Sequence, residues 1–455
     1  MIHPIDNRYG SPEMRQLFEE EKRLELQLKV EAALVASLAE LGHVPVEAAK
    51  EVAKKATLEY VKLDRVKEIE AITRHDVMAL VKAITEVAGD AGKYIPLTAT
   101  SYDIVDTAQA LQLKEAILLV IDKGKVTLKN CLDIARNEKN TVMVGRTHGQ
   151  HAIPITLGFK FANFADKIGQ DLLRLQDDIH CARGKFSGAV GNYAAQDLYG
   201  LGGALERKIM DKLAIAAADI STQVAPRENI ARIISNIAIL AGTVEQLAKE
   251  IRNLQRTEIA EAAEPFGKNQ VGSSTMAQKR NPVNSENICG NARVIRSCVA
   301  PILENIALEH ERDLTNSACE RSVIPTAFVL MDDILMRMNR ILADLVIDRG
   351  NMAKNLALTR GTIMAEAMIT RLVQKGMGRQ VAHEILRQSS FEALANNSDL
   401  KDILLKNYSV LEYLSPGDIE EYSAYNSYIG RSIPKTEQII AKWRDFCLFD
   451  NRPTA

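Results

Sequence analysis

Apolar residues recur along most of this chain at the spacing of an α-helix. After Pro226 they follow steps of three and four, at Ile230, Ile233, Ile234, Ile237, Leu240, Val244, Leu247, Ile251 and Leu254. Side chains at these steps share one face of a helix, whereas alternation by two would indicate a strand. The run continues for roughly thirty residues without a proline, which corresponds to a helix of about 45 Å. The pattern predicts one long helix, and such a helix needs partners of similar length.

Four further segments carry the same pattern and are the candidate partners: residues 103–138, 156–184, 284–312 and 326–347. Several of them are apolar on more than one side, and between Ile104 and Ile121 apolar residues occupy most of the circumference. A helix that is apolar on several sides is buried on several sides, and a single bundle offers too few neighbours. We therefore expect an all-α fold whose long helices assemble with those of other copies in a closed homo-oligomer.

Helix length divides the 455 residues into three zones. Residues 1–100 hold shorter helices with breaks at 42–45 and 92–96, and residues 101–350 carry the long helices. Residues 351–455 again hold shorter helices, with a polar, turn-rich segment at 414–418. No repetitive glycine–serine linker separates the zones. The sequence predicts an N-terminal helical domain, a central long-helix bundle and a C-terminal helical domain that pack together.

The composition is that of an ordinary soluble protein, with 46% hydrophobic and 25% charged residues. The formal net charge is -2 and no long basic run occurs, so a nucleic-acid partner is not expected. The N-terminus lacks a secretory signal, and no apolar run approaches the ~20 residues that span a bilayer. The six cysteines lack short paired spacings, which disfavours disulfides and a zinc site. We expect a cytoplasmic protein without a membrane partner.

Four polar clusters interrupt the helices, and the first two precede apolar helical segments. They are "TRHD" at residues 73–76 and "TATSYD" at residues 98–103. Threonine, serine and aspartate at a helix start commonly cap the free N–H groups. The same N–H groups also favour a bound phosphate or carboxylate. Taken alone, each cluster is compatible with a cap and with an anion site.

The third cluster, "GRTHGQH" at residues 145–151, places His148 in a glycine-containing segment. Glycine lets the backbone approach a ligand closely. A histidine is the side chain best placed to give or take a proton near neutral pH. No metal-ligand partner follows at helical spacing. The cluster therefore favours proton transfer over metal binding.

The fourth cluster, "GSSTMAQKRNP" at residues 272–282, is rich in groups that bind anions. After Gly272, successive backbone N–H groups can form a nest for a negative oxygen. Lys279 adds a mobile cation and Asn281 adds neutral donors, while Glu286 lies early in the next helix. A flexible linker would repeat glycine and serine, and this segment does not.

Together these clusters resemble the fumarase/aspartase superfamily, whose lyases eliminate fumarate from a substituted succinate. The fourth cluster matches the superfamily signature GSSxMPxKxNP. The best match within the superfamily is the branch that acts on succinylated purine nucleotides. Its other matching segments are "RYGSPEM" (8–14), "TRHD" (73–76), "TSYDIVDTA" (100–108), "GRTHGQHAIPITLGFKFA" (145–162) and "ERDLTNSACERSVIP" (311–325). The resemblance covers most of the chain and is weakest in the C-terminal third.

The resemblance implies a role for each matching residue. Ser273 corresponds to the general base that removes a proton from the succinyl group. His148 corresponds to the general acid that protonates the departing nitrogen, and Glu286 to its supporting carboxylate. Lys279 and Asn281 correspond to groups that hold the succinyl carboxylates. The positions implied to bind the nucleotide and its phosphate are Arg8, Tyr9, Arg74, His75, Asp76, Thr100, Ser101, Gln223, Arg312, Ser317 and Arg321.

The resemblance also implies the three-domain, all-α fold of the superfamily. It implies a homotetramer in which each active site draws on three subunits, in agreement with the argument from helix circumference. The reaction needs no metal and no organic cofactor. The expected partners are therefore a small-molecule nucleotide substrate and further copies of the same chain.

Three positions depart from the family pattern. Pro96 stands where a histidine is common, which puts one substrate contact in doubt; His151 or a water could compensate for it. In the signature, Ala277 replaces the usual proline and Gln278 stands where histidine is common. Loss of a loop proline raises the freedom of the open loop by roughly 0.4–1 kcal/mol. We expect a more mobile loop and an active enzyme.

Two alternatives remain from the sequence. One is another lyase of the superfamily, such as argininosuccinate lyase or an aspartase-like enzyme, against which the segments at 8–14 and 311–321 argue. The other is a catalytically silent helical scaffold, which the three departures keep open. Retention of His148, Ser273, Lys279 and Glu286 together argues against the scaffold.

Overall fold

The computed structural model describes residues 4–267 and 269–447, and helices dominate both stretches. The chain divides into two compact units, each built from three segments. Unit 1 contains the residues up to Gly124, Gln170–Val244 and Ile288–Met336. Unit 2 contains Lys125–Gly169, Glu245–Asn287 and the residues from Arg337 onward. The three-domain division, which rests on helix length, is a different partition of the chain and stays a prediction.

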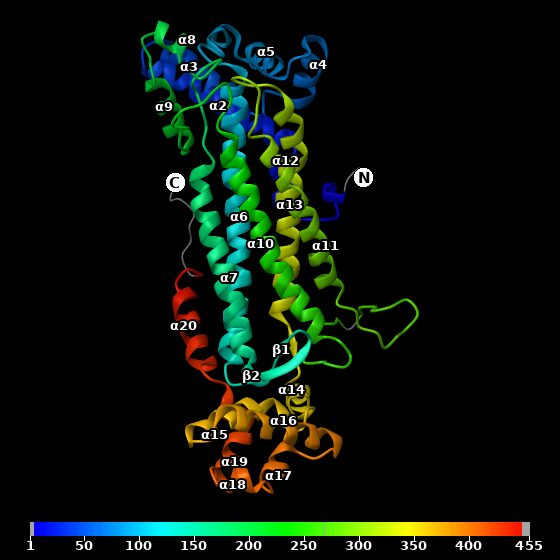
Figure 1. Cartoon of the computed structure of the whole chain (residues 1–455). Coiled ribbons are helices and arrows are strands. Elements are labelled where there is room, and N and C mark those ends of the chain that lie inside the picture. The colour runs from blue at the N-terminus through cyan, green and yellow to red at the C-terminus, as the bar shows by residue number, and fades with distance from the viewer. Residues whose placement is uncertain (1–3, 268, 448–455) are drawn as a thin grey trace. The chain divides into compact units, whose positions relative to one another are not determined.

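Long helices confirm the main prediction from the apolar pattern (Figure 1). The helices α6 (Ser101–Asn137), α10 (Arg227–Leu254) and α13 (Thr315–Ala343) have 37, 28 and 29 residues. Each contributes residues to both units. The predicted stripe of α10 is core, since Ile233, Ile237 and Leu240 are fully buried. By length and composition α10 also resembles a membrane span, but 61% of its most apolar window is buried inside the structure, as in an interior helix.

Three of the predicted long helices have other bounds. The helix α7 (Leu157–Asp178) ends before the predicted residue 184. The segment predicted as one helix over 284–312 is α11 (Val283–Ser297) followed by α12 (Val299–Glu304). The helix α13 begins at Thr315, well before the predicted residue 326, and it continues through Pro325. A proline usually marks a helix start, since it lacks the N–H donor that an interior position uses.

Shorter helices in residues 20–94 and 204–213 of unit 1 pack around one apolar core that includes Leu34, Ile84 and Leu205. The helices within residues 4–94 are shorter than α6, α10 and α13, as predicted. The shorter helices of unit 1 include η1 (Pro4–Asp6), α1 (Pro12–Leu17), α2 (Glu20–Glu40), α3 (Val46–Lys55), α4 (Leu63–Thr73), α5 (Asp76–Ala88), η2 (Gly89–Tyr94), α8 (Ala194–Leu198) and α9 (Ala204–Leu213). The short helix η3 (Ile179–Cys181) follows α7.

A β-hairpin in unit 2 has no counterpart in the predictions. Strands β1 (Val142–Thr147) and β2 (Gln150–Thr156) are antiparallel, and Thr147 pairs with Gln150. His148 and Gly149 therefore form a two-residue loop, and their φ angles of 54° and 75° are those of a type I′ turn. The hairpin packs against α14 (Arg349–Ala357). A second short ladder pairs β3 (Ala262–Ala263) with β4 (Val346–Ile347).

The C-terminal part of unit 2 consists of short helices, several of which pack around Met368, Leu386 and Leu404. The segment predicted as turn-rich begins a helix, because Ser415 caps α19 in a reciprocal capping box with Asp418. These helices are η4 (Thr362–Met364), α15 (Ala365–Gln374), α16 (Arg379–Ala395), α17 (Leu400–Leu404), α18 (Tyr408–Leu411), α19 (Pro416–Ser423), η5 (Tyr425–Tyr428) and α20 (Ser432–Arg444).

Candidate active site

The signature segment forms a loop between α10 and α11 that is closed at its base. Asn281 Nδ2 donates a hydrogen bond to the Gly272 carbonyl at 3.1 Å. A Cβ atom on Gly272 would lie 2.0 Å from the carbonyl oxygen of Lys279. Only glycine allows this approach, so the first residue of the signature is required by the shape of the loop.

The hydroxyl of Ser273 receives two backbone hydrogen bonds inside this loop. The N–H groups of Thr275 and Met276 donate to Ser273 Oγ at 3.3 and 3.1 Å. Hydrogen bonds donated to an oxygen favour its charged form. Of the N–H groups that the sequence predicts as an anion nest, at residues 273–275, the N–H of Thr275 faces the serine's own oxygen.

The far end of the loop is held by polar groups of unit 2. Glu264 accepts a hydrogen bond from the N–H of Ser285 at 2.6 Å, at the start of α11. Gln255 accepts from the N–H of Glu264 at 2.9 Å and donates to the carbonyl of Arg280 at 3.0 Å. These contacts fix the first turn of α11, which presents the exposed Glu286.

The hairpin that carries His148 is fixed by a buried ion pair. Arg146 donates two hydrogen bonds to the carboxylate of Glu261, at 2.8 and 2.7 Å. The Glu261 side chain is fully buried, and it also accepts from Asn355 Nδ2 at 2.8 Å. His148 itself is exposed at the tip of the hairpin. The turn therefore holds an exposed imidazole on a rigid base.

His151, on the second strand, has the opposite environment. Its Nδ1 atom is buried and has no hydrogen-bond partner within residues 4–267 and 269–447. Burial lowers the pKa of His151, the charge of Arg146 lowers it further, and Glu261 opposes the shift. A lowered pKa disfavours the protonated form. Of the two histidines in this cluster, His148 is the better candidate for a proton donor.

The predicted catalytic groups do not contact one another in the single chain. Across the described part of the chain, the side chains of His148, Lys279 and Glu286 have no hydrogen-bond or ion-pair partner. The support of His148 by Glu286 therefore stays a prediction. All of the predicted catalytic residues belong to unit 2.

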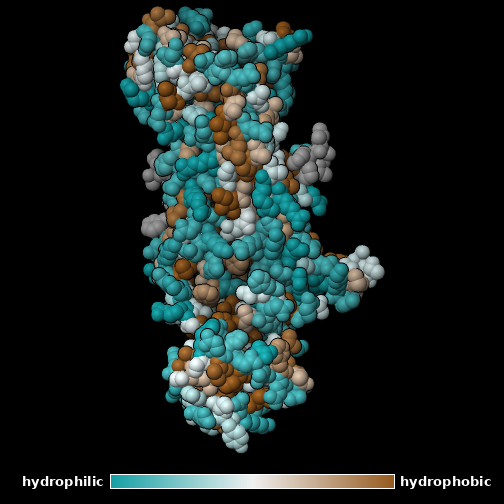
Figure 2. All heavy atoms as spheres, in the orientation of Figure 1, coloured by the Kyte–Doolittle hydropathy of each residue, from teal (hydrophilic) through white to brown (hydrophobic). Residues whose placement is uncertain are grey.

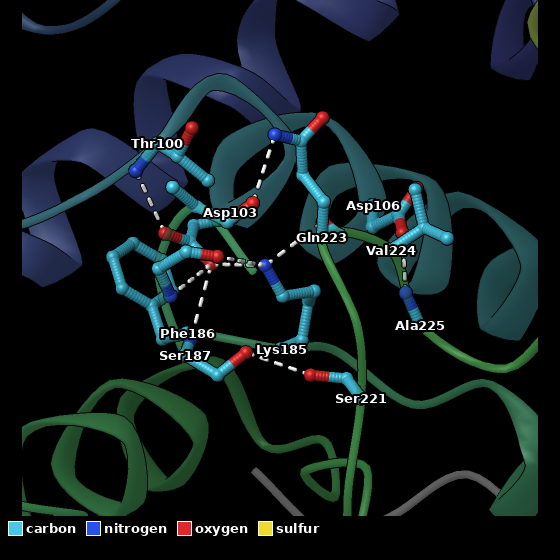
Figure 3. A network of polar contacts seen from close by, with 12 residues as sticks. Thr100, Asp103, Asp106, Lys185, Phe186, Ser187, Ser221, Gln223, Val224 and Ala225 are labelled. Atoms are coloured by element: carbon cyan, nitrogen blue, oxygen red, sulfur yellow. Dashed lines mark hydrogen bonds and ion pairs between the residues drawn. The ribbon is translucent and has the colours of Figure 1, made fainter. Parts of the chain in front are cut away.

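The predicted nucleotide-binding residues belong to unit 1, and several of them contact one another. Arg312 donates a hydrogen bond to Gln223 Oε1 at 2.8 Å, and its guanidinium lies 3.4 Å from the ring centroid of Tyr102. Gln223 Nε2 donates to the carbonyl of Ala189 at 2.9 Å. Thr100 precedes α6, where its N–H donates to Asp103 at 2.7 Å (Figure 3). Ser101 is the first residue of that helix.

A pocket of about 310 Å³ lies beside these residues, and Tyr102, Ser317 and Arg321 are part of its wall. Arg23 also lines it. The guanidinium groups of Arg321 and Arg23 lie 3.7 and 3.9 Å from the carboxylate of Asp76. The structure thus places Ser317 and Arg321 on the wall of one cavity and Asp76 beside Arg321.

The cap of α5 differs from the expected arrangement. His75 is the N-cap residue, and its Nδ1 atom accepts from the N–H of Met78 at 3.3 Å. Asp76 accepts from the adjacent N–H of Val77, as expected of the aspartate, whereas Thr73 is not a cap. An imidazole nitrogen can accept this hydrogen bond as well as a hydroxyl can.

The remaining predicted residues are less constrained. Arg74 is exposed and has a left-handed backbone at the end of α4. Arg8 is exposed, and Tyr9 is half-buried with its carbonyl accepting from Arg15 at 3.2 Å. Pro96 begins the turn before α6 by accepting from the N–H of Ala99 at 3.1 Å.

Two residues of this region were absent from the sequence predictions. Asp103 and Lys185 form an ion pair whose side chains are both fully buried. The available signal was a single charged residue, Lys185, among small and apolar residues in the glycine-bounded segment "GKFSGAVG" at residues 184–191. A buried lysine requires a partner, but the sequence does not indicate which carboxylate supplies it.

Comparisons with known proteins agree with the superfamily signature. The family described as lyase matches residues 7–297, and the family described as adenylosuccinate lyase C-terminus matches residues 361–438. The chain is 46% identical to the adenylosuccinate lyase of Pyrococcus abyssi over 441 residues, which cover 96% of this chain and 97% of that protein. It is 46% identical to the adenylosuccinate lyase of Methanocaldococcus jannaschii, covering 96% of this chain and 95% of that protein.

Solved structures give the same picture of the fold. A fumarate lyase from Mesorhizobium sp. BNC1 superimposes with a TM-score of 0.88 at 28% identity, covering 96% of this chain and 99% of that one. A 3-carboxy-cis,cis-muconate lactonizing enzyme from Pseudomonas putida superimposes with a TM-score of 0.86 at 28% identity, covering 97% and 99%. The helical fold predicted from the sequence is thereby confirmed.

Proposed function

The chain belongs to the adenylosuccinate lyase family, and we propose that it eliminates fumarate from adenylosuccinate to give AMP. The proposal extends to the succinylated aminoimidazole carboxamide ribotide of purine synthesis (SAICAR), which carries the same succinyl-amino group and would yield AICAR. The observation that carries the proposal is identity of 46% to adenylosuccinate lyases along nearly the whole chain. We further propose a cytoplasmic enzyme that uses neither metal nor organic cofactor.

Ser273 is proposed as the general base. As an alkoxide it takes a proton from the β-carbon of the succinyl group, and the electrons left on that carbon delocalise into the adjacent carboxylate. A serine is a weak base at its ordinary pKa, so the site must favour the charged oxygen. The hydrogen bonds from the N–H groups of Thr275 and Met276 support this role, because they are aimed at Ser273 Oγ.

His148 is proposed as the general acid. When the carbon–nitrogen bond breaks, the electron pair stays on the departing amine of AMP, and the imidazolium donates a proton to it. The products are AMP, fumarate, a neutral imidazole and a serine hydroxyl, so protons and electrons balance. Exposure of His148 at the tip of a fixed turn supports the assignment. Glu286 is proposed to stabilise the imidazolium once another copy or the bound substrate completes the site.

Lys279 and Asn281 are proposed to hold the succinyl carboxylates. The aci-carboxylate formed in the intermediate carries two negative charges beside the second carboxylate, and fixed donors near these charges lower the barrier more than solvent does. Lys279 contributes an exposed ammonium, and Asn281 keeps one amide N–H beyond the one that closes the loop. Closure of the loop over the substrate would exclude water and strengthen both contacts.

The enzyme is proposed to be a homotetramer with active sites shared among three copies. Among the described residues, the side chains of His148, Lys279 and Glu286 have no hydrogen-bond or ion-pair partner, which supports a site completed by other chains. Exposed apolar side chains on the long helices support the assembly, among them Ile239 on α10 and Val294 on α11, which are 48% and 42% exposed. Figure 2 shows such hydrophobic residues uncovered within a mostly hydrophilic face.

The proposal is tested by following fumarate release from purified protein supplied separately with adenylosuccinate, the succinylated ribotide, argininosuccinate and aspartate. Turnover of the two purine substrates is expected. Turnover of argininosuccinate or aspartate alone would favour a different lyase of the superfamily. Absence of turnover with every substrate, in protein that is folded and assembled, would favour the helical scaffold. Ser273→Ala serves as the inactive control.

A further inference from the structure

The buried ion pair of Asp103 and Lys185 reaches several predicted nucleotide-binding positions at once (Figure 3). Asp103 lies in the first turn of α6, and Lys185 lies in the extended segment that follows α7 and η3. Their charged atoms are 2.6 Å apart, and both side chains are fully buried. An ion pair in this environment keeps one geometry, because any displacement leaves a charge without a partner.

The carboxylate of Asp103 has each oxygen fixed by hydrogen bonds. Its Oδ2 atom accepts from the N–H of Thr100 at 2.7 Å. Its Oδ1 atom accepts from Lys185 and from the N–H groups of Ser187 and Gly188, at 3.1 and 3.3 Å. Asp103 therefore ties the Thr100–Ser101 turn to the loop that follows Lys185.

The ammonium of Lys185 uses all of its donors. Besides Asp103, it donates to the carbonyl of Gly188 at 3.2 Å and to the carbonyl of Gln223 at 3.0 Å. An ammonium has three N–H bonds, so none is left for a ligand. The main chain of Lys185 is also fixed, since Thr107 Oγ1 donates to its carbonyl at 2.9 Å.

Gln223 connects the ion pair to Arg312. Its backbone carbonyl is held by Lys185, and its side-chain oxygen accepts from Arg312 at 2.8 Å. Its N–H donates to the carbonyl of Glu311 at 3.3 Å. The ring of Tyr102, next to Asp103 in sequence, lies against the Arg312 guanidinium. The placement of Arg312 thus depends on both ends of the ion pair.

We propose that Asp103 and Lys185 are positioning residues that set the geometry of the nucleotide-binding side of the site. The pair does not contact the reacting atoms: it acts through Thr100, Gln223 and Arg312. This inference rests on the proposed function, because it assigns those residues to the nucleotide. Loss of the pair is expected to weaken nucleotide binding and to leave the chemical step nearly intact.

The test compares Lys185→Met, Lys185→Arg and Asp103→Asn with wild type. For Lys185→Met and Asp103→Asn, KM for adenylosuccinate should rise by about tenfold or more while kcat changes by less than about threefold, as expected when uniform binding is lost. Lys185→Arg keeps the charge and should show a smaller rise in KM. Titration calorimetry with AMP should give a Kd that rises in parallel. The double variant Asp103→Asn/Lys185→Met should be no worse than the poorer single variant, because the two residues act as a unit.

Asp178→Asn is the matched control. Asp178 is also a fully buried aspartate of unit 1, and it accepts from Asn236 Nδ2 at 2.7 Å. It contacts no predicted nucleotide-binding residue among those that the structure describes. Its replacement should lower stability and leave KM and the Kd for AMP at the wild-type values. If KM of Asp178→Asn rose as much as that of Asp103→Asn, general destabilisation would explain both results and the inference would be overturned.

The two proposals fail in different ways. If wild type releases no fumarate, the proposed function fails. If wild type is active but folded Lys185→Arg and Asp103→Asn keep the wild-type KM and Kd for AMP, the positioning role fails alone. A fall in kcat with unchanged KM would also overturn it, since the pair would then act on the chemical step. If Lys185→Met does not fold, the two milder variants carry the test.

Discussion

The polar groups of the candidate site are held in different ways in the two units. In unit 1, Gln223 and Arg312 contact each other and depend on a buried ion pair. In unit 2, the side chains of His148 and Lys279 are exposed and have no partner among the described residues. A buried charge must find its partner within the chain, whereas an exposed one is satisfied by water until a ligand replaces it. We therefore expect the proposed nucleotide side to form during folding and the proposed catalytic side to be completed when a ligand or another copy of the chain binds.

The largest effect expected from this comparison is a loss of activity with little change in the free energy of unfolding. Ser273→Ala and His148→Ala should each lower kcat by about 10²–10⁴-fold, the range for a general acid or base. Their free energies of unfolding should stay within about 0.5 kcal/mol of wild type, because neither side chain supports the core. Fumarate release and urea unfolding at one protein concentration measure the two quantities. A large loss of stability in either variant would contradict the separation of the two roles.

Stability should respond to the buried pair beneath the hairpin. Glu261→Gln leaves Arg146 without its charged partner, and breaking a buried pair costs about 3–5 kcal/mol. Glu286→Gln, at an exposed carboxylate of the same unit, should change the free energy of unfolding by less than about 0.5 kcal/mol. Urea unfolding of both variants gives the comparison. Equal losses in the free energy of unfolding would show that burial does not determine how much each carboxylate contributes to stability.

Among its described residues, unit 1 also contains a buried carboxyl group that lacks the hydrogen-bond partners its other buried charges have. Glu31 is fully buried, and neither of its oxygens has a hydrogen-bond partner in the part of the chain that the structure describes. Burial, with the nearby charge of Asp103, raises the pKa of Glu31 to about 8 from its ordinary value of 4.5. The folded chain then keeps a proton that the unfolded chain releases. Stability should therefore fall as pH rises from about 4.5 to about 8.

Glu31→Gln should remove this dependence. The variant and wild type should have similar stability near pH 4.5, and the variant should gain a growing advantage up to about pH 8, on the order of 4 kcal/mol. Urea unfolding at several pH values across this window measures it. The same advantage at every pH would mean that Glu31 does not hold its proton in the folded chain.

The smallest effect concerns the catalytic loop. Ala277→Pro should restrict the open loop and favour the ordered form by roughly 0.4–1 kcal/mol. The expected result is a modest change in the rate of loop closure, measured with fluorescence and single-turnover kinetics. Gly272→Ala is the opposite case, because its Cβ would collide with the Lys279 carbonyl and distort the loop. No change in closure or rate for Ala277→Pro would argue against a loop loosened by the missing proline.

The sequence predicts where helices form better than it predicts which segments pair with one another. Steps of three and four residues identify α10, and its buried stripe follows directly from the pattern. The predicted start at residue 326 is too late for α13, because this helix continues through Pro325 despite the missing N–H donor. The hairpin was missed because Val142–Thr156 is short and its alternation is broken by the irregularity between Val144 and Arg146. Local patterns report local structure, and this irregularity is set by pairing with a second strand.

The site shows the same limit. The signature motif identifies Ser273, Lys279 and Asn281 as one group because they are neighbours in the chain. The partnership of Asp103 with Lys185 joins residues 82 positions apart, and no spacing rule connects them. The approach of His148 and Ser273 to one substrate cannot be read from sequence spacing either, since we propose that they come from different copies of the chain.

Mixing two inactive variants tests this central claim most directly. His148→Ala and Ser273→Ala protein, dissociated together and reassembled, should regain activity if each site takes its histidine and its serine from different copies. Random assembly would then leave up to about one quarter of the sites with both groups intact. If both groups come from the same chain, every site in the mixture lacks one of them. A mixture that assembles fully and stays as inactive as its parents would contradict the account.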